Sequence, residues 1–177
     1  MKSRFSAADL ARTGLFAALI IVCTFVTVPL PTGVPLTLQT FAVALGGFLL
    51  GPTYGTLAVG VYLLLGAAGL PVFSGFTGGI GRFAGPTGGF LLGFLLLAAG
   101  CGLGRGRSLP LRFLPGLAGL LLCHFLGVWW YSRTAGPAFP AAALSVSLPF
   151  LPKDVASLVF ALAFARLLEK RGVLKKP

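Results

Sequence analysis

Long apolar stretches, separated by short proline- and glycine-rich breaks, dominate the hydropathy pattern of this 177-residue chain. Between Arg12 and Arg82 there is no Asp, Glu, Lys or Arg, which leaves room for three membrane-spanning helices of about 20 residues each. Prolines and glycines divide this stretch, and proline both lacks the backbone N–H and restricts the residue before it. We therefore predict helices over about residues 8–28, 36–50 and 54–68, with a tight turn at Gly51-Pro52-Thr53.

A glycine-rich segment follows the third predicted helix. Residues 71–89 read PVFSGFTGGIGRFAGPTGG, and so much glycine disfavours a stable spanning helix. We predict an ordered but irregular loop on the outer side of the membrane. Further apolar stretches at about 87–103, 114–131 and 150–168 complete six spanning helices. The predicted fold is an all-α, polytopic membrane protein, with residues 1–177 as a single integral membrane domain.

Composition favours a membrane protein over a soluble one. Charged residues make up 10% of the chain and hydrophobic residues 56%, with a mean hydropathy of +0.97, whereas soluble domains carry about 25% charged residues. Soluble enzymes and nucleic-acid-binding modules are thereby disfavoured. We interpret the basic residues behind the net charge of +11 as markers of membrane topology, because Lys and Arg concentrate in cytoplasmic loops. Cytoplasmic termini would put eleven of the fourteen basic residues inside and leave Arg82, Arg133 and Lys153 outside.

Two adjacent charges, Lys153 and Asp154, follow Pro149 and Pro152 at the outer start of the last apolar stretch. Ionisable groups at membrane depth are costly and usually face a cavity or a partner. In a cavity, the cation would hold an anionic group, and the carboxylate would accept N–H donors from a ligand. The alternative is a pair that only caps the helix at the membrane interface, where Asp154 favours the positive end of the helix dipole.

Arg82 lies inside the glycine-rich segment, with Phe73, Phe76 and Phe83 close by. A fixed cation among aromatic side chains suits a ligand with an apolar body and one carboxylate, although an arginine anchored at the lipid headgroups would look the same. Gln39, in the second predicted helix, either points to the same cavity or bonds across helices.

Other patterns limit the chemistry. No Gly-x-x-x-x-Gly-Lys-[Ser/Thr] phosphate loop occurs, so the chain is not expected to hydrolyse ATP itself. The three cysteines and one histidine form no metal-binding pattern. We predict neither a catalytic set nor a metal site. His124, the single histidine, falls mid-segment, where a neutral hydrogen-bonded side chain is favoured over a proton relay.

The motifs resemble a known family. The stretch from Val34 to Phe94, VPLTLQTFAVALGGFLLGPTYGTLAVGVYLLLGAAGLPVFSGFTGGIGRFAGPTGGFLLGF, strongly resembles the BioY family, the biotin-specific S components of energy-coupling factor (ECF) transporters. The likeness extends more loosely to ARTGLFAALI and LPFLPKD. It implies a substrate-binding domain of six helices in a prokaryotic plasma membrane, with both termini cytoplasmic. It further implies biotin uptake through an outward pocket closed by the loops between helices 1 and 2 and between helices 3 and 4.

The resemblance also implies roles for individual residues. Arg82 or Lys153 would pair with the biotin carboxylate, and Asp154 would accept from the ureido N–H groups. Four residues of the glycine-rich loop and one of the second helix complete the expected substrate-binding set: Phe73, Ser74, Gly78, Gly79 and Gln39. The family usually has a lysine three residues after the aspartate, where this chain has Ser157. We hypothesise that Lys153 supplies the missing cation.

Expected partners follow from the same resemblance. Small residues four apart let a second helix approach closely, and Ala7 and Ala11 would dock on the transmembrane coupling protein, which works with two ABC-type ATPases. On spacing alone, packing inside the same bundle is an equal alternative. No cofactor and no nucleic-acid partner is expected.

Two other functions are weighed against biotin binding. A solitary secondary transporter for a small organic anion, driven by an ion gradient, would need a protonatable group at mid-membrane, and only His124 is placed for that. A membrane-embedded enzyme acting on lipid lacks a plausible catalytic set.

Overall fold

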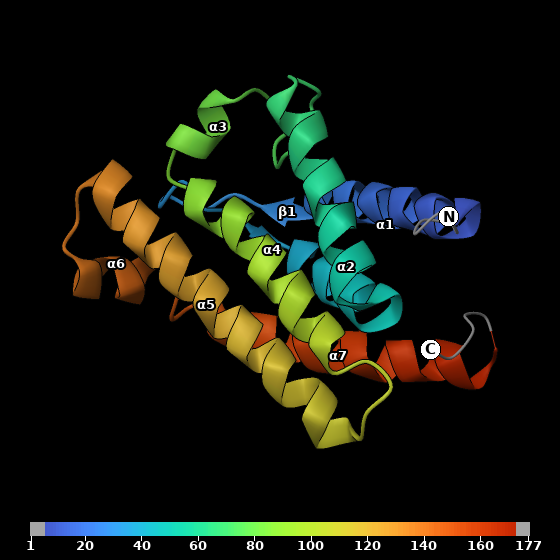
Figure 1. Cartoon of the computed structure of the whole chain (residues 1–177). Helices are drawn as coiled ribbons and strands as arrows, with labels where there is room; N and C mark the ends of the chain where they lie inside the picture. Colours follow the sequence, from blue (N-terminus) through green and yellow to red (C-terminus); the bar gives the residue numbers. More distant parts are fainter. Residues whose placement is uncertain (1–5, 173–177) are drawn as a thin grey trace.

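The computed structural model of this chain describes residues 6–172 and is predominantly helical (Figure 1). Its elements are α1 (Ala7–Phe25), β1 (Thr27–Val28), β2 (Leu36–Thr37), α2 (Gln39–Ala67), α3 (Gly81–Ala84), α4 (Gly88–Leu103), α5 (Leu109–Ala135), α6 (Phe139–Val146) and α7 (Leu151–Lys170). The predicted all-α class is confirmed.

Membrane crossings can be assigned to some of these helices by length and hydropathy. Within residues 6–172, α1, α2 and α5 are each long and apolar enough to span a bilayer, and α6 with α7, bent by 55°, forms a further candidate span. α4 is apolar but shorter, at 16 residues. The count of six crossings stays a prediction. The start of α1 and the end of α7 lie at the same side of the molecule in Figure 1.

α2 consists of two helices joined at a break. Gly51 has φ 82° and ψ 178°, a conformation that glycine adopts without the penalty of a Cβ. Pro52 follows inside the helix and cannot donate to the hydrogen-bond ladder. The predicted break between the second and third apolar stretches is therefore confirmed, and it falls at Gly51.

Two predicted helix boundaries near the first turn are wrong. Residues 27–28 and 36–37 form a small antiparallel hairpin, with Thr27 opposite Thr37 and Val28 opposite Leu36. The first helix therefore ends at Phe25, and the second begins at Gln39. Val26, Thr27 and Val28 are β-branched and precede two prolines, so they favour extended backbone even in an apolar stretch.

The connection before the last helix also differs from the prediction. We expected only a link between residues 132 and 149, but α6 occupies Phe139–Val146. Pro140 lies in its first turn, where proline is tolerated because the N–H there has no helical partner. α5 is likewise longer than predicted at both ends. Gly136, with φ 93°, caps it in the left-handed conformation.

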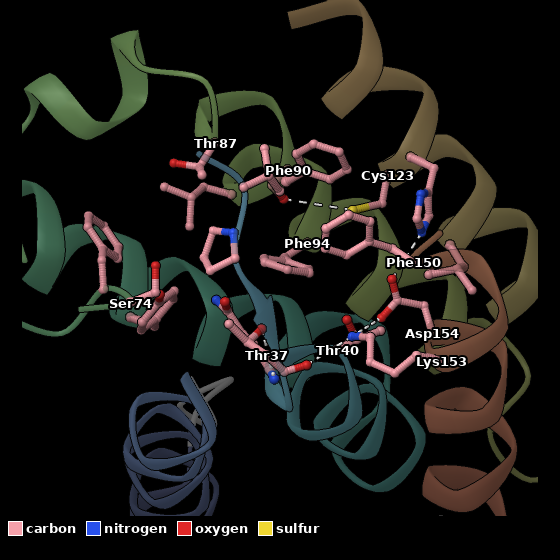
Figure 2. A pocket seen from close by; sticks show the side chains of 18 of the residues that line it. Thr37, Thr40, Ser74, Thr87, Phe90, Phe94, Cys123, Phe150, Lys153 and Asp154 are labelled. Carbon is pink, nitrogen blue, oxygen red and sulfur yellow. Dashed lines mark hydrogen bonds and ion pairs between the residues drawn. The ribbon is translucent and has the colours of Figure 1, made fainter. Parts of the chain in front are cut away.

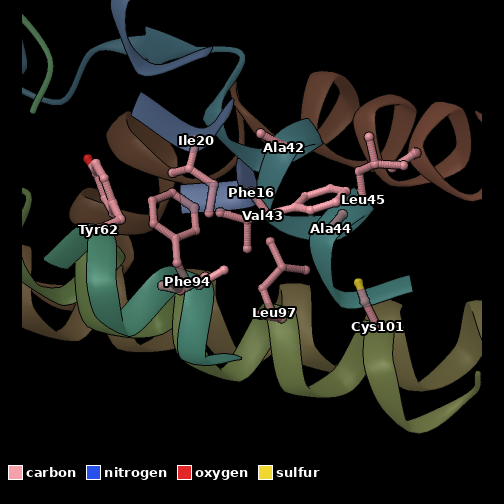
Figure 3. Packing of buried hydrophobic residues seen from close by; sticks show 14 of the residues in the cluster. Phe16, Ile20, Ala42, Val43, Ala44, Leu45, Tyr62, Phe94, Leu97 and Cys101 are labelled. Atoms are coloured by element: carbon pink, nitrogen blue, oxygen red, sulfur yellow. The ribbon is translucent and has the colours of Figure 1, made fainter. Parts of the chain in front are cut away.

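The core lies where α4 packs between α2 and α5, with α1 and α7 against α2. Figure 3 shows Ile20, Val43 and Leu97 gathered in this core, and all three are almost fully buried. Glycine makes the helix contacts close: a Cβ added at Gly93 of α4 would lie 2.8 Å from the Cα of Cys123 on α5. Backbones can approach this closely only through small residues, so Gly93 permits the close packing of α4 on α5.

Candidate functional site

A cavity lies where the hairpin, α2, α4, α5 and α7 meet under the segment that precedes α4 (Figure 2). Counted with its open mouth, it holds about 710 Å³ of space. Its lining residues are Val34, Pro35, Thr37, Gln39, Thr40, Tyr62, Phe73, Ser74, Arg82, Thr87, Phe90, Leu91, Phe94, Leu120, Cys123, His124, Phe150, Lys153 and Asp154.

Six of the eight substrate-binding residues proposed from the sequence line this cavity: Gln39, Phe73, Ser74, Arg82, Lys153 and Asp154. Gly78 and Gly79 are not among the lining residues. Gly79 has φ 97°, and its N–H donates to the carbonyl of Gly66 over 2.7 Å. A side chain at Gly78 would collide with the carbonyl of Leu70. These two glycines therefore shape the loop that carries Phe73 and Ser74.

Asp154 is the acidic residue of the cavity. It lies in the first turn of α7 and is 5% exposed. Its Oδ1 pairs with the Lys153 ammonium, and its Oδ2 lies 3.2 Å from His124 Nε2. The side chain of Thr40 lies beside it (Figure 2). A buried carboxylate with these neighbours presents acceptor oxygens to the cavity.

Lys153 connects two parts of the chain that are far apart in sequence. Its Nζ donates to the backbone carbonyl of Thr37, at 2.9 Å, in addition to pairing with Asp154. An ammonium has three N–H donors, so two are used by the protein. Lys153 therefore fastens the β1–β2 hairpin to the start of α7 and keeps one N–H for the cavity.

Arg82, on α3, is held by the loop before it. Its Nε and Nη2 donate to Thr77 Oγ1 at 2.8 and 2.5 Å, and the Thr77 hydroxyl donates to the carbonyl of Ser74 at 2.9 Å. Guanidinium has five N–H donors, so several stay available to an anion. Because its own partner is neutral, Arg82 is a cation without a protein carboxylate among the residues from 6 to 172.

Aromatic side chains divide between the cavity and the outer surface. Phe73 packs edge-on against Tyr62 and Phe83, with ring centroids 5.4 and 5.8 Å apart. Phe76, which the sequence placed near Arg82, is not a lining residue. It instead stacks on Phe25 at the end of α1, with centroids 4.4 Å apart. Phe76 thus holds the outside of the loop against α1.

His124 is hydrogen-bonded on both ring nitrogens. Nδ1 lies 2.9 Å from Ser147 Oγ, and Nε2 faces Asp154. These contacts fit a buried polar side chain that orients the carboxylate. In the tautomer that carries its proton on Nε2, the ring donates to Asp154 and accepts at Nδ1 from the Ser147 hydroxyl.

Several lining residues were missed by the sequence reasoning. Thr40, Tyr62, Phe90 and Phe94 were counted only as parts of apolar helices. Phe90 and Phe94 are four residues apart, which places them on one face of α4, and this spacing was an available signal. Within residues 6–172, Tyr62 Oη and Gln39 Nε2 are buried and form no hydrogen bond of standard geometry, although the Tyr62 hydroxyl lies near the side chains of Gln39 and Thr24. Buried polar atoms are normally satisfied, so both are suited to meet polar atoms of a ligand.

Comparisons with known proteins agree on one family. The sequence model described as BioY family matches residues 1–173. A protein of Thermotoga maritima named biotin transporter BioY is 42% identical over 167 residues, covering 93% of this chain and 98% of that protein. One of Pyrococcus horikoshii, named probable biotin transporter BioY, is 40% identical over 163 residues, covering 92% and 97%. The crystal structure of the S-component for biotin from an ECF-type ABC transporter matches with a TM-score of 0.85 and 28% identity, covering 96% of this chain and 95% of that one.

Proposed function

Because this chain belongs to the BioY family, we propose that it is the biotin-binding S component of an ECF transporter and that biotin binds in the cavity below the loop before α4. It is a membrane transport protein and not an enzyme. Biotin has an apolar valeryl chain, one carboxylate and a ureido group with two N–H donors. A cavity with one buried carboxylate, one unpaired cation and aromatic walls complements all three parts.

The observation that carries this proposal is the separation of opposite charges across the cavity. Figure 2 shows Ser74 and Asp154 on opposite sides, and Arg82 is joined to Ser74 through Thr77. We assign the ureido N–H groups to Asp154 and the carboxylate of biotin to Arg82. Arg82 is preferred over Lys153 because Lys153 is already paired with Asp154 and Thr37.

Uptake by cells tests the transport part of the proposal. A biotin-auxotrophic host lacking its own transporter is expected to grow on nanomolar biotin when it expresses this chain with a coupling protein and two ABC-type ATPases. Inactivating the ATPases should abolish that uptake, since no nucleotide-binding motif is present in this chain. Uptake that persists without them and follows an ion gradient would instead favour the solitary secondary transporter.

We further propose a plasma-membrane location with both termini cytoplasmic. The support is that α1 starts and α7 ends at the same side of the molecule, and that Lys and Arg concentrate near these ends. Such a distribution is typical of the cytoplasmic side.

The docking surface for the coupling protein is proposed on α1. Ala7, Ala11, Gly14 and Ala18 are all exposed, so this stripe of small residues is not used to pack α1 within its own bundle. Replacing Ala11 with Trp is expected to block close helix approach and to prevent co-purification with the coupling protein, while biotin affinity changes less than twofold. Leu10→Trp is the matched control, because Leu10 is exposed and already large. Equal assembly of both variants would contradict the assignment.

Lys153 is expected to control how long biotin stays bound. Lys153→Met breaks the link between the hairpin and α7. We therefore expect biotin to dissociate about tenfold faster, which corresponds to a loss of roughly 1.4 kcal/mol in the barrier to biotin release. Stopped-flow displacement of a fluorescent biotin derivative measures that rate. Lys170→Met, the same change at the far end of α7, is the control. An unchanged dissociation rate in Lys153→Met would refute a role for this tether.

His124 is expected to act by positioning Asp154. His124→Ala removes one hydrogen bond to the carboxylate, which is worth about 1.5–3 kcal/mol for a charged group, and should weaken biotin binding by roughly 10- to 100-fold. His124→Gln keeps an N–H donor and should recover part of that loss. If Gln and Ala weaken binding equally in a calorimetric titration, the orienting role is wrong.

A further inference from the structure

A second hollow lies on the outside of the bundle, at the end opposite the biotin cavity. It is a groove between the first turns of α5 and the last turns of α7, and it holds about 860 Å³ of space counted with its open side. Its lining residues are Leu109, Pro110, Phe113, Val159, Leu162, Ala163 and Arg166. Figure 1 shows α5 crossing α7. The middle of α5 meets the first turn of α7 at the His124–Asp154 contact, and the groove lies between the start of α5 and the later turns of α7.

An ion pair fixes the inner edge of this groove. Arg112, one turn into α5, is 3% exposed and forms a bidentate pair with Glu169 of α7, at 2.8 and 2.9 Å. Its Nη2 also donates to the carbonyl of Phe48 at 3.2 Å. The two helices are therefore held together on the side facing α2. The groove on the other side is a built feature and not a consequence of loose packing.

The groove is lined by apolar side chains and has one cationic side chain, Arg166, at its end. Six of its seven lining side chains are apolar, and small Ala163 leaves room along α7. From Val159 to Arg166 the groove follows α7 for about 10 Å, at 1.5 Å per residue. That length suits part of an acyl chain.

Arg166 at the end of the groove lacks a counter-charge from the protein. Over residues 6–172 it has no ion pair or hydrogen bond to another side chain. The chain has three acidic residues, and each is already engaged: Asp9 with Arg12, Glu169 with Arg112, and Asp154 in the biotin cavity. No acidic side chain of residues 6–172 is therefore left to neutralise Arg166.

We propose that this groove binds an anionic phospholipid, with one acyl chain along Leu109, Phe113 and Leu162 and the phosphate paired with Arg166. Basic pockets between transmembrane helices on the cytoplasmic side commonly bind anionic headgroups. Charge complementarity favours this occupant over an apolar helix of another protein, which would offer the exposed Arg166 guanidinium no counter-charge. The lipid would lie on the face of the α5–α7 contact opposite the Arg112–Glu169 ion pair.

Native mass spectrometry of the purified full-length chain tests the site. With phosphatidylglycerol and phosphatidylcholine of identical acyl chains, we expect one phosphatidylglycerol to bind at least tenfold more tightly than phosphatidylcholine. Arg166→Gln should remove most of that preference, and Arg166→Lys should keep part of it. Arg107→Gln removes the same charge from an exposed residue of the α4–α5 loop that does not line the groove, and it should change binding less than twofold.

A charge-neutral variant separates the groove from the headgroup contact. Ala163→Phe fills the groove and should weaken both lipids about tenfold, while biotin affinity reports that the variants are folded. The proposal is overturned if phosphatidylglycerol shows no preference, if Arg166→Gln and Arg107→Gln behave alike, or if Ala163→Phe has no effect. Loss of coupling-protein assembly in Ala163→Phe, with no phosphatidylglycerol bound to the wild-type chain, would assign the groove to that protein instead and would equally overturn the proposal.

Discussion

Asp154→Asn is expected to weaken biotin binding by about 100-fold. The carboxylate accepts the ureido N–H donors in our assignment, and a hydrogen bond to a charged group is worth about 1.5–3 kcal/mol. The substitution also leaves the Lys153 ammonium without its ionic partner at a site where both side chains are largely buried, and breaking such a pair is costly. Calorimetric titration of the variant in nanodiscs measures the loss.

An acidic residue at the other end of the bundle gives a matched control. Asp9 lies in the first turn of α1 and pairs with Arg12, far from the cavity lining. Asp9→Asn should leave biotin affinity within twofold. If Asp154→Asn binds biotin as tightly as the wild type, the ureido group does not use this carboxylate, and the orientation of biotin that we propose is wrong.

Arg82→Gln is expected to weaken biotin by roughly 30- to 100-fold. Its guanidinium is the cation of the cavity that no protein carboxylate neutralises within residues 6–172. A thermodynamic cycle combines this substitution with a change in the ligand. Biotin methyl ester lacks the negative charge of biotin, so it removes the proposed partner of Arg82. The ester should bind the wild type about as weakly as biotin binds Arg82→Gln, and the variant should not distinguish the two ligands.

Two alternative roles of Arg82 and Lys153 predict different affinities for biotin and its ester. If Lys153 holds the carboxylate, Arg82→Gln will still discriminate biotin from its ester, and Lys153→Met will not. If Arg82 only anchors the loop through Thr77, both ligands will lose affinity equally. Arg133→Gln, an exposed arginine near the end of α5, is the control for loss of charge on the proposed outer side.

Much of this site could be predicted because its chemistry stands out in an apolar sequence. Lys153 and Asp154 are adjacent charges beside two prolines, and Arg82 is an isolated cation in a glycine-rich loop. Few other positions could carry a polar ligand. The break at Gly51 could also be predicted, because a Gly-Pro pair interrupts an otherwise continuous apolar stretch.

Other features depend on contacts between residues far apart in sequence. The bond from Lys153 to Thr37 joins residues 116 apart, and no local pattern indicates it. The pairing of β1 with β2 was not predicted, because Val and Thr are uncharged and continue the apolar pattern of the neighbouring helices. Their extended backbone conformation depends on pairing between the two strands. Arg112 resembled a cytoplasmic loop residue, yet Glu169 and the Phe48 carbonyl allow it to be buried.

The most direct test of the central claim is calorimetric titration of the purified wild-type chain, in nanodiscs, with biotin and with thiamin as an unrelated vitamin. Our account predicts one biotin per chain with nanomolar affinity and no heat from thiamin. A well-folded chain that gives no biotin signal, or that binds both vitamins alike, would contradict the assignment of the cavity to biotin.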